Sequence, residues 1–309
     1  MKIYTSLDQI IAPLPHACVT IGNFDGVHLG HQQLFSTVNQ RARRRRGVGV
    51  AVTFEPHPLQ VMRPEVGIKL ISTYEQKVEL IAMAGVEILL ALPFTREFAA
   101  MDAGSFVDLA LVKTLGVREL VVGYDYAFGK GRGGDVEFLK ACGRKRDFMV
   151  RVIPAFRVDG MVVSSSKIRE LVTAGRMKEV SKLLGRYYQL QGVVQRGRQR
   201  GSSVLGFPTV NLSLDEKDLC PKYGVYVTQM AHADQCYGGV LNIGYNPTFN
   251  DGRLVAETHI FDFNQDIYDQ PIKINLLQHL REERRFTSPA ELAAQIARDV
   301  AKAKEVLAS

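Results

Sequence analysis

Two histidines near the start of the chain are spaced so that both could hold one phosphate group. Residues 22–31 read Gly-Asn-Phe-Asp-Gly-Val-His-Leu-Gly-His and follow an apolar run that predicts a strand. The glycines allow a tight turn from the strand into a helix, whose first turn offers free N–H groups and the positive end of the dipole. His28 and His31 would project from that turn on the same side. The segment therefore predicts a phosphate site in which both histidines donate hydrogen bonds.

If ATP is the ligand and is attacked at its α-phosphorus, the reaction at such a site is nucleotidyl transfer. Attack on the α-phosphorus requires no covalent enzyme intermediate, so positioning and stabilisation of charge on the leaving pyrophosphate would carry the catalysis. The site would include Gly22, Asn23, Phe24 and Gly30 around the two histidines. Two other interpretations stay open. The histidines could simply cap a helix after a glycine turn, or they could be a His-x-x-His metal pair without an obvious further ligand.

A second segment has the features of an anion site. Residues 164–169 read Ser-Ser-Ser-Lys-Ile-Arg, follow a predicted strand and open another helix. Ser165 and Ser166 supply hydroxyls and Arg169 supplies a guanidinium for phosphate, although the serines alone could be an ordinary N-cap. Two such helix starts in one α/β domain favour a nucleotide whose triphosphate lies between them.

The second half of the chain carries a different polar pair. Residues 200–211 read Arg-Gly-Ser-Ser-Val-Leu-Gly-Phe-Pro-Thr-Val-Asn. Gly201 and Gly206 permit close approach of backbone to phosphate, while Thr209 and Asn211 alternate on an extended chain and so share one face. The pair could bind Mg²⁺ together with ATP oxygens, or could be turn residues. The spacing of a P-loop is absent, which argues against a P-loop kinase.

Composition places these sites in a two-domain globular protein. The chain has 309 residues, 46% of them hydrophobic and 23% charged, with a net charge of +7 that favours anionic ligands. It shows neither a secretory signal nor an apolar run long enough to span a bilayer, so we expect a cytoplasmic protein without a membrane partner. The four cysteines, Cys18, Cys142, Cys220 and Cys236, form no C-x-x-C pair and are expected to be reduced thiols.

One basic run needs its own interpretation. Residues 41–46 read Arg-Ala-Arg-Arg-Arg-Arg and fall at the C-terminal end of the helix that begins near His31. Cations complement the dipole at such an end. We therefore expect a solvated helix end and no nucleic acid partner.

The elements that position the first two segments alternate between strands and helices. β-Branched runs predict strands at 17–21, 48–54, 86–92, 119–122 and 148–153, and helical spacing of apolar residues predicts helices at 32–44, 74–84, 105–115 and 136–142. This order is typical of crossover units and a mostly parallel, doubly wound sheet. A further helix starts near Ser166 and another ends near Leu184, where Gly185 can form a left-handed C-cap.

Beyond Gly185 the pattern changes. Strand-like runs at 187–194, 224–230, 238–243, 255–261 and 272–277 are separated by Gly, Pro, Asn and Asp, and predict a small antiparallel barrel or sandwich. Residues 289–307 predict a final helix with Ser288 as its N-cap. The predicted domains are therefore 1–185 and 186–309.

These motifs together resemble the His-x-Gly-His nucleotidyltransferase superfamily and, within it, the prokaryotic bifunctional riboflavin kinase/FAD synthetases. The resemblance includes Phe54-Glu55-Pro56-His57-Pro58, the segment 122–129 with Gly134-Asp135, and the Pro-Thr-x-Asn motif that ends at Asn211. It covers nearly the whole chain. It implies a Rossmann-like FMN adenylyltransferase domain followed by a six-stranded flavokinase barrel. Residues 54–58 alone could equally be a proline-rich turn.

The resemblance also implies roles for single residues. His28, His31, Ser165, Ser166 and Arg169 would bind ATP phosphates, Asn23 and Asp125 would lie near the substrates, and Thr209 and Asn211 would bind the metal. Glu257, in the run Ala-Glu-Thr-His, would be the general base on a ribityl hydroxyl of riboflavin. Two departures stand out. Ser166 replaces the common threonine and keeps its hydroxyl, whereas Ala127 replaces an arginine.

The predicted function is thus a two-step synthesis of flavin cofactors. The barrel would phosphorylate riboflavin to FMN with ATP and Mg²⁺, and the α/β domain would transfer AMP from a second ATP to FMN, forming FAD and releasing pyrophosphate. Two alternatives remain at this point. One is a nucleotidyltransferase for another phosphorylated small molecule with an accessory barrel, and the other is a flavin-binding regulator that has lost the chemistry.

Overall fold

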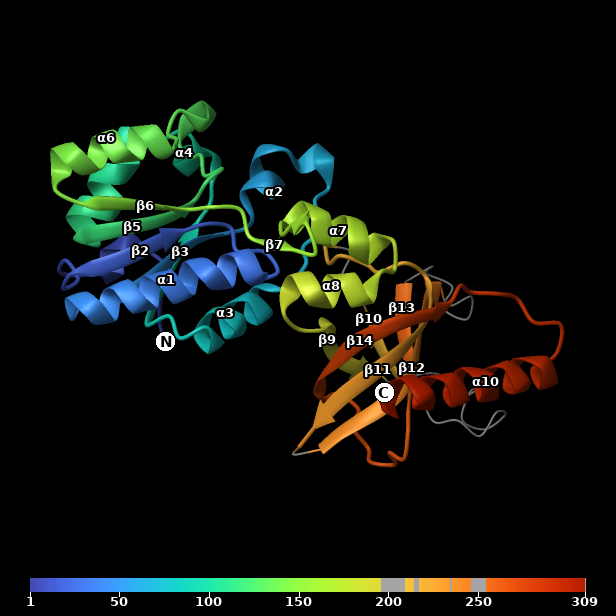
Figure 1. Ribbon diagram of the computed structural model, residues 1–309. Helices are drawn as coiled ribbons and strands as arrows, with labels where there is room; N and C mark the ends of the chain where they lie inside the picture. Colours follow the sequence, from blue (N-terminus) through green and yellow to red (C-terminus); the bar gives the residue numbers. More distant parts are fainter. Residues whose placement is uncertain (196–208, 214–216, 234, 246–253, 309) are drawn as a thin grey trace. The chain divides into compact units, whose positions relative to one another are not determined.

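The chain forms two compact units, Met1–Ser165 and Ser166–Ser309, each described here by itself (Figure 1). The computed structural model describes residues 1–195, 209–213, 217–233, 235–245 and 254–308. The division falls before the boundary predicted after Gly185, because residues 166–185 are grouped with the second unit.

The first unit contains a fully parallel sheet. Its strands are β1 (Lys2–Tyr4), β2 (Ala17–Ile21), β3 (Gly49–Glu55), β4 (Ile88–Pro93), β5 (Val117–Gly123) and β6 (Met149–Ile153). They are ordered β1-β4-β3-β2-β5-β6, and every neighbouring pair is parallel. All five residues of β2 are buried, as expected for a central strand covered on both faces.

Helices cover both faces of this sheet (Figure 1). On one face α1 (Leu29–Arg45) and α3 (Tyr74–Met83) contribute Phe35, Val38 and Ile81 to a core with Ala51 and Val121. On the other face, α5 (Ala103–Phe106), the π-helix η3 (Val107–Thr114) and α6 (Val136–Arg146) pack on the opposite side chains of the same strands. The predicted doubly wound α/β class is therefore confirmed.

Short elements connect the layers of this unit. They are the 3-10 helices η1 (Leu7–Gln9), η2 (Pro64–Val66) and η4 (Lys130–Arg132), the helices α2 (Pro58–Met62) and α4 (Arg96–Ala99), and the hairpin of β7 (Arg157–Val158) and β8 (Met161–Val162).

The basic end of α1 is only partly solvated. Arg43 and Arg44 are exposed in its last turn, but Arg41 and Arg45 bind Glu119 on β5, with Nε to carboxylate distances of 2.8 and 3.1 Å. Arg151 on β6 binds the same carboxylate at 3.0 Å, and Glu119 itself has no exposed surface. The run of arginines therefore includes a structural ion cluster that its sequence did not reveal.

The second unit is a closed antiparallel barrel. Its strands are β9 (Tyr188–Gln195), β10 (Thr209–Ser213), β11 (Gly224–His232), β12 (Gln235–Tyr245), β13 (Leu254–Ile260) and β14 (Pro271–Arg281), ordered β10-β13-β12-β11-β14-β9. This arrangement settles the alternative between barrel and sandwich in favour of the barrel. The helices α7 (Ser165–Thr173) and α8 (Met177–Leu184) precede it, and Gly185 ends α8 in the left-handed conformation, with φ of 71°, as predicted.

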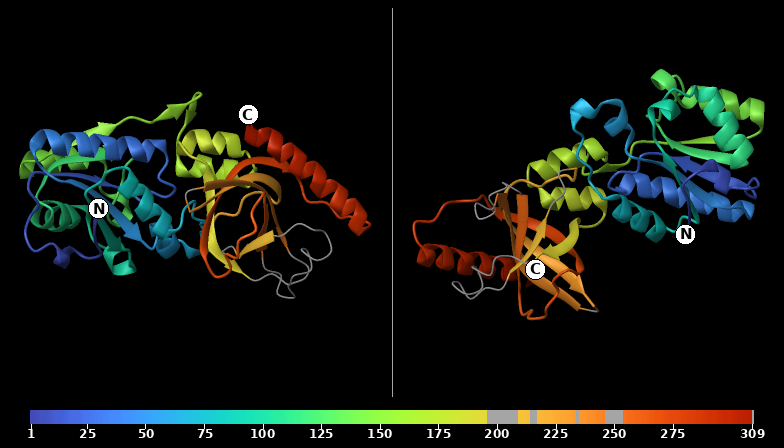
Figure 2. Two further views of the ribbon diagram at one scale, coloured as in Figure 1. Left: turned by 90° about the horizontal axis from the view of Figure 1, so that it is seen from below. Right: turned by 180° about the vertical axis from the view of Figure 1, so that it is seen from behind.

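The final helix α10 (Pro289–Ala308) lies on the outer surface of the barrel (Figure 2). Val300, Ala303 and Leu307 pack against Val227 and Leu277 of the strands. The backbone N–H of Glu291 donates to Ser288 Oγ at 3.2 Å, so the predicted N-cap is confirmed.

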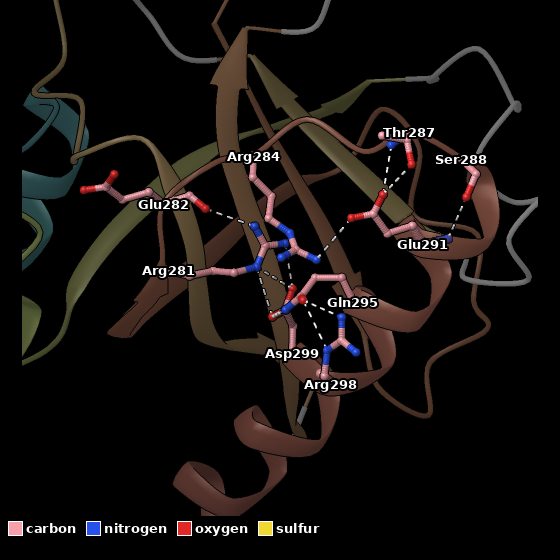
Figure 3. Close-up of polar contacts among 9 residues, drawn as sticks. All are labelled: Arg281, Glu282, Arg284, Thr287, Ser288, Glu291, Gln295, Arg298 and Asp299. Atoms are coloured by element: carbon pink, nitrogen blue, oxygen red, sulfur yellow. Dashed lines mark hydrogen bonds and ion pairs between the residues drawn. The ribbon is translucent and has the colours of Figure 1, made fainter.

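A buried ion pair fastens the same helix to the end of β14 (Figure 3). Arg281 donates through Nε and Nη2 to the carboxylate of Asp299 at 3.0 and 2.8 Å. Gln295 Nε2 donates to the same carboxylate at 2.8 Å, and Asp299 is 5% exposed. These contacts tie the last residue of β14 to the middle of α10.

Two candidate active sites

The first candidate site lies at the carboxyl edge of the parallel sheet, where open α/β sheets bind their ligands. Asn23 follows β2, and Asp125 follows β5, the strand hydrogen-bonded beside it. Asp125 is exposed, and Asn23 accepts a hydrogen bond from Thr53 Oγ1 through its backbone oxygen at 3.2 Å. The two predicted substrate-proximal residues therefore follow neighbouring strands at one edge.

His28 is the N-cap of α1. Its Nδ1 accepts a hydrogen bond from the backbone N–H of His31 at 3.3 Å, and the two rings stack with centroids 3.5 Å apart and planes inclined by 16°. The capping interpretation of His28 is thus correct as geometry. The cap engages Nδ1, and a neutral imidazole has a second ring nitrogen, so capping alone does not rule out phosphate binding.

His31 is held in its neutral form. Burial, followed by the nearby His28, lowers its pKa well below the ordinary value of 6.5. At neutral pH the ring is therefore an uncharged imidazole that can donate one hydrogen bond. Within the described ranges, no cluster of three histidine, cysteine or carboxylate residues could hold a metal ion, so the His-x-x-His pair gains no support as a metal site.

The loop between β2 and α1 is tightly packed. A Cβ on Gly22 would lie 2.7 Å from the ring of Phe24, and a Cβ on Gly30 would lie 3.2 Å from the ring of His28. Phe24 is fully buried and contacts His31 edge-on, with ring centroids 5.3 Å apart. Its ring belongs to the core, so any contact of Phe24 with ATP would come from its backbone.

The predicted second anion segment is split between the two units. Ser165 Oγ donates to the backbone oxygen of Asp25 at 3.1 Å, which ties this serine to the histidine loop. Ser166 and Arg169 lie in α7 and are grouped with the second unit. Their assignment to ATP phosphates stays a prediction.

Residues 54–58 form a turn that starts a short helix. His57 caps α2, and its own backbone N–H donates to Gln60 Oε1 at 3.2 Å, which completes a capping box. Glu55, at the carboxyl edge, pairs with Lys77 of α3 at 2.9 Å, and Lys77 is 6% exposed. Sequence reasoning missed this buried lysine because a single lysine in an amphipathic helix ordinarily faces solvent.

The second candidate site lies on the outer face of the barrel. Asn211 on β10, Glu257 on β13 and Asn242 on β12 are cross-strand register partners in one row. The adjacent row holds Leu212, Ala256 and Ile243, which have no exposed surface. Since side chains alternate along a strand, the first row points out of the barrel.

The polar side chains of this row differ in the hydrogen bonds that they make. Asn211 is 8% exposed, and its side chain makes no hydrogen bond within the part of the chain that the structure describes. Asn242 Nδ2 donates to Glu283 Oε1 at 3.2 Å. Glu283 lies just after β14 and was not predicted, because its approach depends on long-range folding. Thr209 lies in β10, but its side chain is not described, and Gly201 and Gly206 fall outside the described residues.

Known protein families match both halves of the chain. A family model described as FAD synthetase matches residues 11–167, and one described as riboflavin kinase matches residues 184–307. The bifunctional riboflavin kinase/FMN adenylyltransferase of Escherichia coli K12 is 34% identical, covering 99% of this chain and 97% of its own. The protein of the same name from Pseudomonas fluorescens is 37% identical and covers 96% of each chain.

A solved structure matches the whole architecture. It is named a macrolide-efflux protein from Streptococcus pneumoniae, is 32% identical, and has a TM-score of 0.87 over 98% of each chain. In the described part of the present chain, no helix is both long and apolar enough to cross a membrane. Both family models and the two relatives agree with the enzyme class predicted from sequence. The chain therefore belongs to the bifunctional riboflavin kinase/FMN adenylyltransferase family, with an FAD synthetase domain followed by a riboflavin kinase domain.

Proposed function

We propose which residues carry the two reactions of this bifunctional enzyme, riboflavin phosphorylation and FMN adenylylation. The observation that carries the kinase assignment is the direct pairing of Asn211 with Glu257 on the outer face of the barrel. The adenylyltransferase assignment rests on the stacked pair His28 and His31 at the start of α1. ATP, riboflavin and FMN are the small molecules that these sites would bind.

In the kinase site Glu257 is the general base. Its carboxylate takes the proton from a ribityl hydroxyl of riboflavin, the freed oxygen attacks the γ-phosphorus of ATP, and ADP leaves with the electrons of the broken P–O bond. Glu257 is only partly buried and belongs to the outward-pointing row of the barrel. Asn211 beside it orients the reacting groups through its amide.

The residues next to Glu257 fit a magnesium ion. Mg²⁺ prefers oxygen ligands and is commonly bound by one or two side chains together with substrate phosphates. The nearly buried amide of Asn211 offers such an oxygen without losing a hydrogen bond to any described residue, and Thr209 is two residues away on the same strand. Bound there, Mg²⁺ would neutralise charge on the ATP phosphates.

In the adenylyltransferase site a phosphate oxygen of FMN attacks the α-phosphorus of ATP and pyrophosphate leaves. His28 and His31 act as hydrogen-bond donors to the phosphates, and His31 does so without a positive charge. The backbone of Gly22, Phe24 and Gly30 lines the turn. Asn23 and Asp125 orient the substrates from the ends of their strands, and Ser165, Ser166 and Arg169 complete the phosphate contacts.

We also propose that the functional boundary between the two domains falls after Gly185. We also assign the enzyme to the cytoplasm, with small molecules as its substrates and without nucleic acid or membrane partners. Its strong basic character then serves anionic substrates.

The test uses the two activities of one chain as controls for each other. Purified protein is incubated with riboflavin, ATP and Mg²⁺, and the flavins are resolved by chromatography. Glu257→Gln should abolish FMN formation while FAD formation from supplied FMN persists, and His31→Ala should do the reverse. Glu305→Gln, the same change on the exposed side of α10, should affect neither. Loss of both activities in either site variant, with the fold intact, would refute the two-site assignment.

A further inference from the structure

Asp25 connects three segments around the histidine loop. Asp25 is 4% exposed, and its Oδ1 accepts hydrogen bonds from the backbone N–H groups of Ile71 and Ser72 at 3.0 and 3.3 Å. Its backbone oxygen accepts from Ser165 Oγ at 3.1 Å. One residue later, the N–H of Gly26 donates to Ser72 Oγ at 3.1 Å. Two other segments, residues 71–72 and Ser165, thus hold the turn that leads to His28 through hydrogen bonds.

The same turn has an unfavourable backbone conformation. Phe24, Gly26 and Val27 have φ values of 51°, 77° and 39°, in the left-handed region. For a β-branched residue such as Val27 this conformation is a true outlier, and each such residue costs on the order of 1–3 kcal/mol. It persists only where surrounding contacts determine it, and the contacts of Asp25 are of that kind.

The constrained turn ends at the residues that need precise placement. Val27 immediately precedes His28, and His28 caps the helix through the N–H of His31. A change in the backbone of residues 24–27 would therefore rotate both imidazoles. Because hydrogen bonds to a transition state depend steeply on position, a shift of about 1 Å can reduce a rate by about 100-fold.

We propose that Asp25 is a positioning residue for adenylyl transfer, since its bonds to Ile71 and Ser72 hold the strained turn that aims His28 and His31. This inference rests on the proposed assignment of the two histidines to the ATP phosphates. Asp25 contacts neither substrate in this role. It acts through the backbone of the turn.

The central test is Asp25→Asn, which keeps the size of the side chain but removes its charge and replaces one accepting oxygen with an amide group. If the histidines contact mainly the transition state, kcat and kcat/KM for FMN adenylylation should fall together by at least about tenfold, with KM for ATP changing less than about threefold. Riboflavin kinase activity of the same chain should be unchanged, which shows that the variant protein is intact.

Asp102→Asn is the matched control. Asp102 also caps a helix in this unit, since its Oδ1 accepts the N–H of Ser105 at 2.9 Å, but it is exposed and caps α5 rather than the histidine turn. It should lower the melting temperature without altering adenylyl transfer. If Asp25→Asn fails to fold, Ser72→Ala carries the test, because it removes only the bond to Gly26 and should lower kcat about two- to tenfold.

Two results would overturn the inference. One is a folded Asp25→Asn protein with kcat within about twofold of the parent, or, where that variant does not fold, an unchanged kcat in Ser72→Ala. The other is an equal loss in Asp102→Asn. His31→Ala distinguishes a wrong positioning role for Asp25 from a wrong assignment of the two histidines. If His31→Ala is inactive and the Asp25 variant is not impaired, only the positioning role is wrong, whereas an active His31→Ala removes the assignment itself.

Discussion

Asn211 and Glu257 face each other directly across β10 and β13 on the outside of the barrel. Glu257 is in turn the register partner of Asn242, whose amide donates to Glu283. An amide, a carboxylate and a second amide therefore occupy neighbouring strands on one face. The pairing matters because directly opposite residues in an antiparallel ladder have Cβ atoms only about 4.5–5.5 Å apart, so both side chains can reach one substrate.

Replacement of Asn211 should affect magnesium use without affecting stability. Asn211→Ala removes an amide that has no internal hydrogen bond in the described structure, so the melting temperature should change little. The Mg²⁺ concentration for half-maximal kinase activity and KM for ATP should each rise about tenfold or more, while adenylyl transfer stays constant. Asn211→Asp, which keeps a hard oxygen ligand, should lose less.

Asn242→Ala serves as the comparison for that experiment. It removes a neighbouring amide that is engaged with Glu283, so it should cost some stability while its Mg²⁺ dependence stays near that of the parent. If instead Asn211→Ala lowers the melting temperature and leaves the Mg²⁺ titration unchanged, Asn211 is a structural residue of the barrel.

The buried pair of Arg281 and Asp299 should contribute strongly to the stability of the second unit. Asp299→Ala leaves a guanidinium whose side chain is only 22% exposed without its main partner, so we expect a loss on the order of 2–3 kcal/mol in urea unfolding. Glu305→Ala, which breaks the exposed pair with Lys302, should cost less than about 1 kcal/mol. Equal effects of the two substitutions would show that α10 is held by its apolar contacts alone.

The predictability of the fold depends on how much of each element is buried. Residues 17–21 were predicted with the observed bounds because a continuous apolar run is typical of a central parallel strand. β1 was missed because it is a three-residue edge strand with little burial. Residues 105–115 were predicted as one helix, whereas the chain forms α5 and then a π-helix, a change in backbone hydrogen bonding that apolar spacing does not encode.

The sites were predictable to the extent that their residues are close in sequence. The alternation of Thr209 and Asn211 indicated a shared face, but their register with Glu257 depends on the pairing of distant strands and came only from family resemblance. Asp25 and Lys77 were missed for the same reason. A buried carboxylate or amine becomes informative only when its partners Ser72 and Glu55 are known.

Glu119 should be essential to the stability of the first unit. Burial raises its pKa, but hydrogen bonds and charges from Arg151 and Arg41 outweigh that effect, so the pKa lies below the ordinary value of 4.5. Glu119→Gln would leave three guanidinium groups close together without a counter-ion, at a cost on the order of 3 kcal/mol. Asp147→Asn, which breaks the exposed pair with Arg118, should cost less than about 1 kcal/mol. A small effect at Glu119 would mean that solvent screens the arginines.

Protonation of His31 should contribute to the pH dependence of the free energy of unfolding. Folding lowers the pKa of His31 well below 6.5. In the pH range between the lowered pKa and about 6.5, the unfolded chain therefore binds a proton at this residue and the folded chain does not. Stability should therefore be constant above about pH 7.5 and decline as pH falls below 6.5, by up to about 1.4 kcal/mol per pH unit. His31→Gln should remove this part of the slope in urea unfolding.

His279 gives the corresponding test for the second unit in the same urea unfolding experiment. Its pKa is also lowered by burial, so it contributes a decline of the same sign in the barrel, and His279→Gln should remove a different part of the slope. The Glu119 cluster acts in another window, because a carboxylate with a lowered pKa loses its contribution only as pH falls below about 4.5. A decline below pH 6.5 that survives His31→Gln unchanged would show that folding does not lower the pKa of His31, and this support for its role as a neutral donor would be lost.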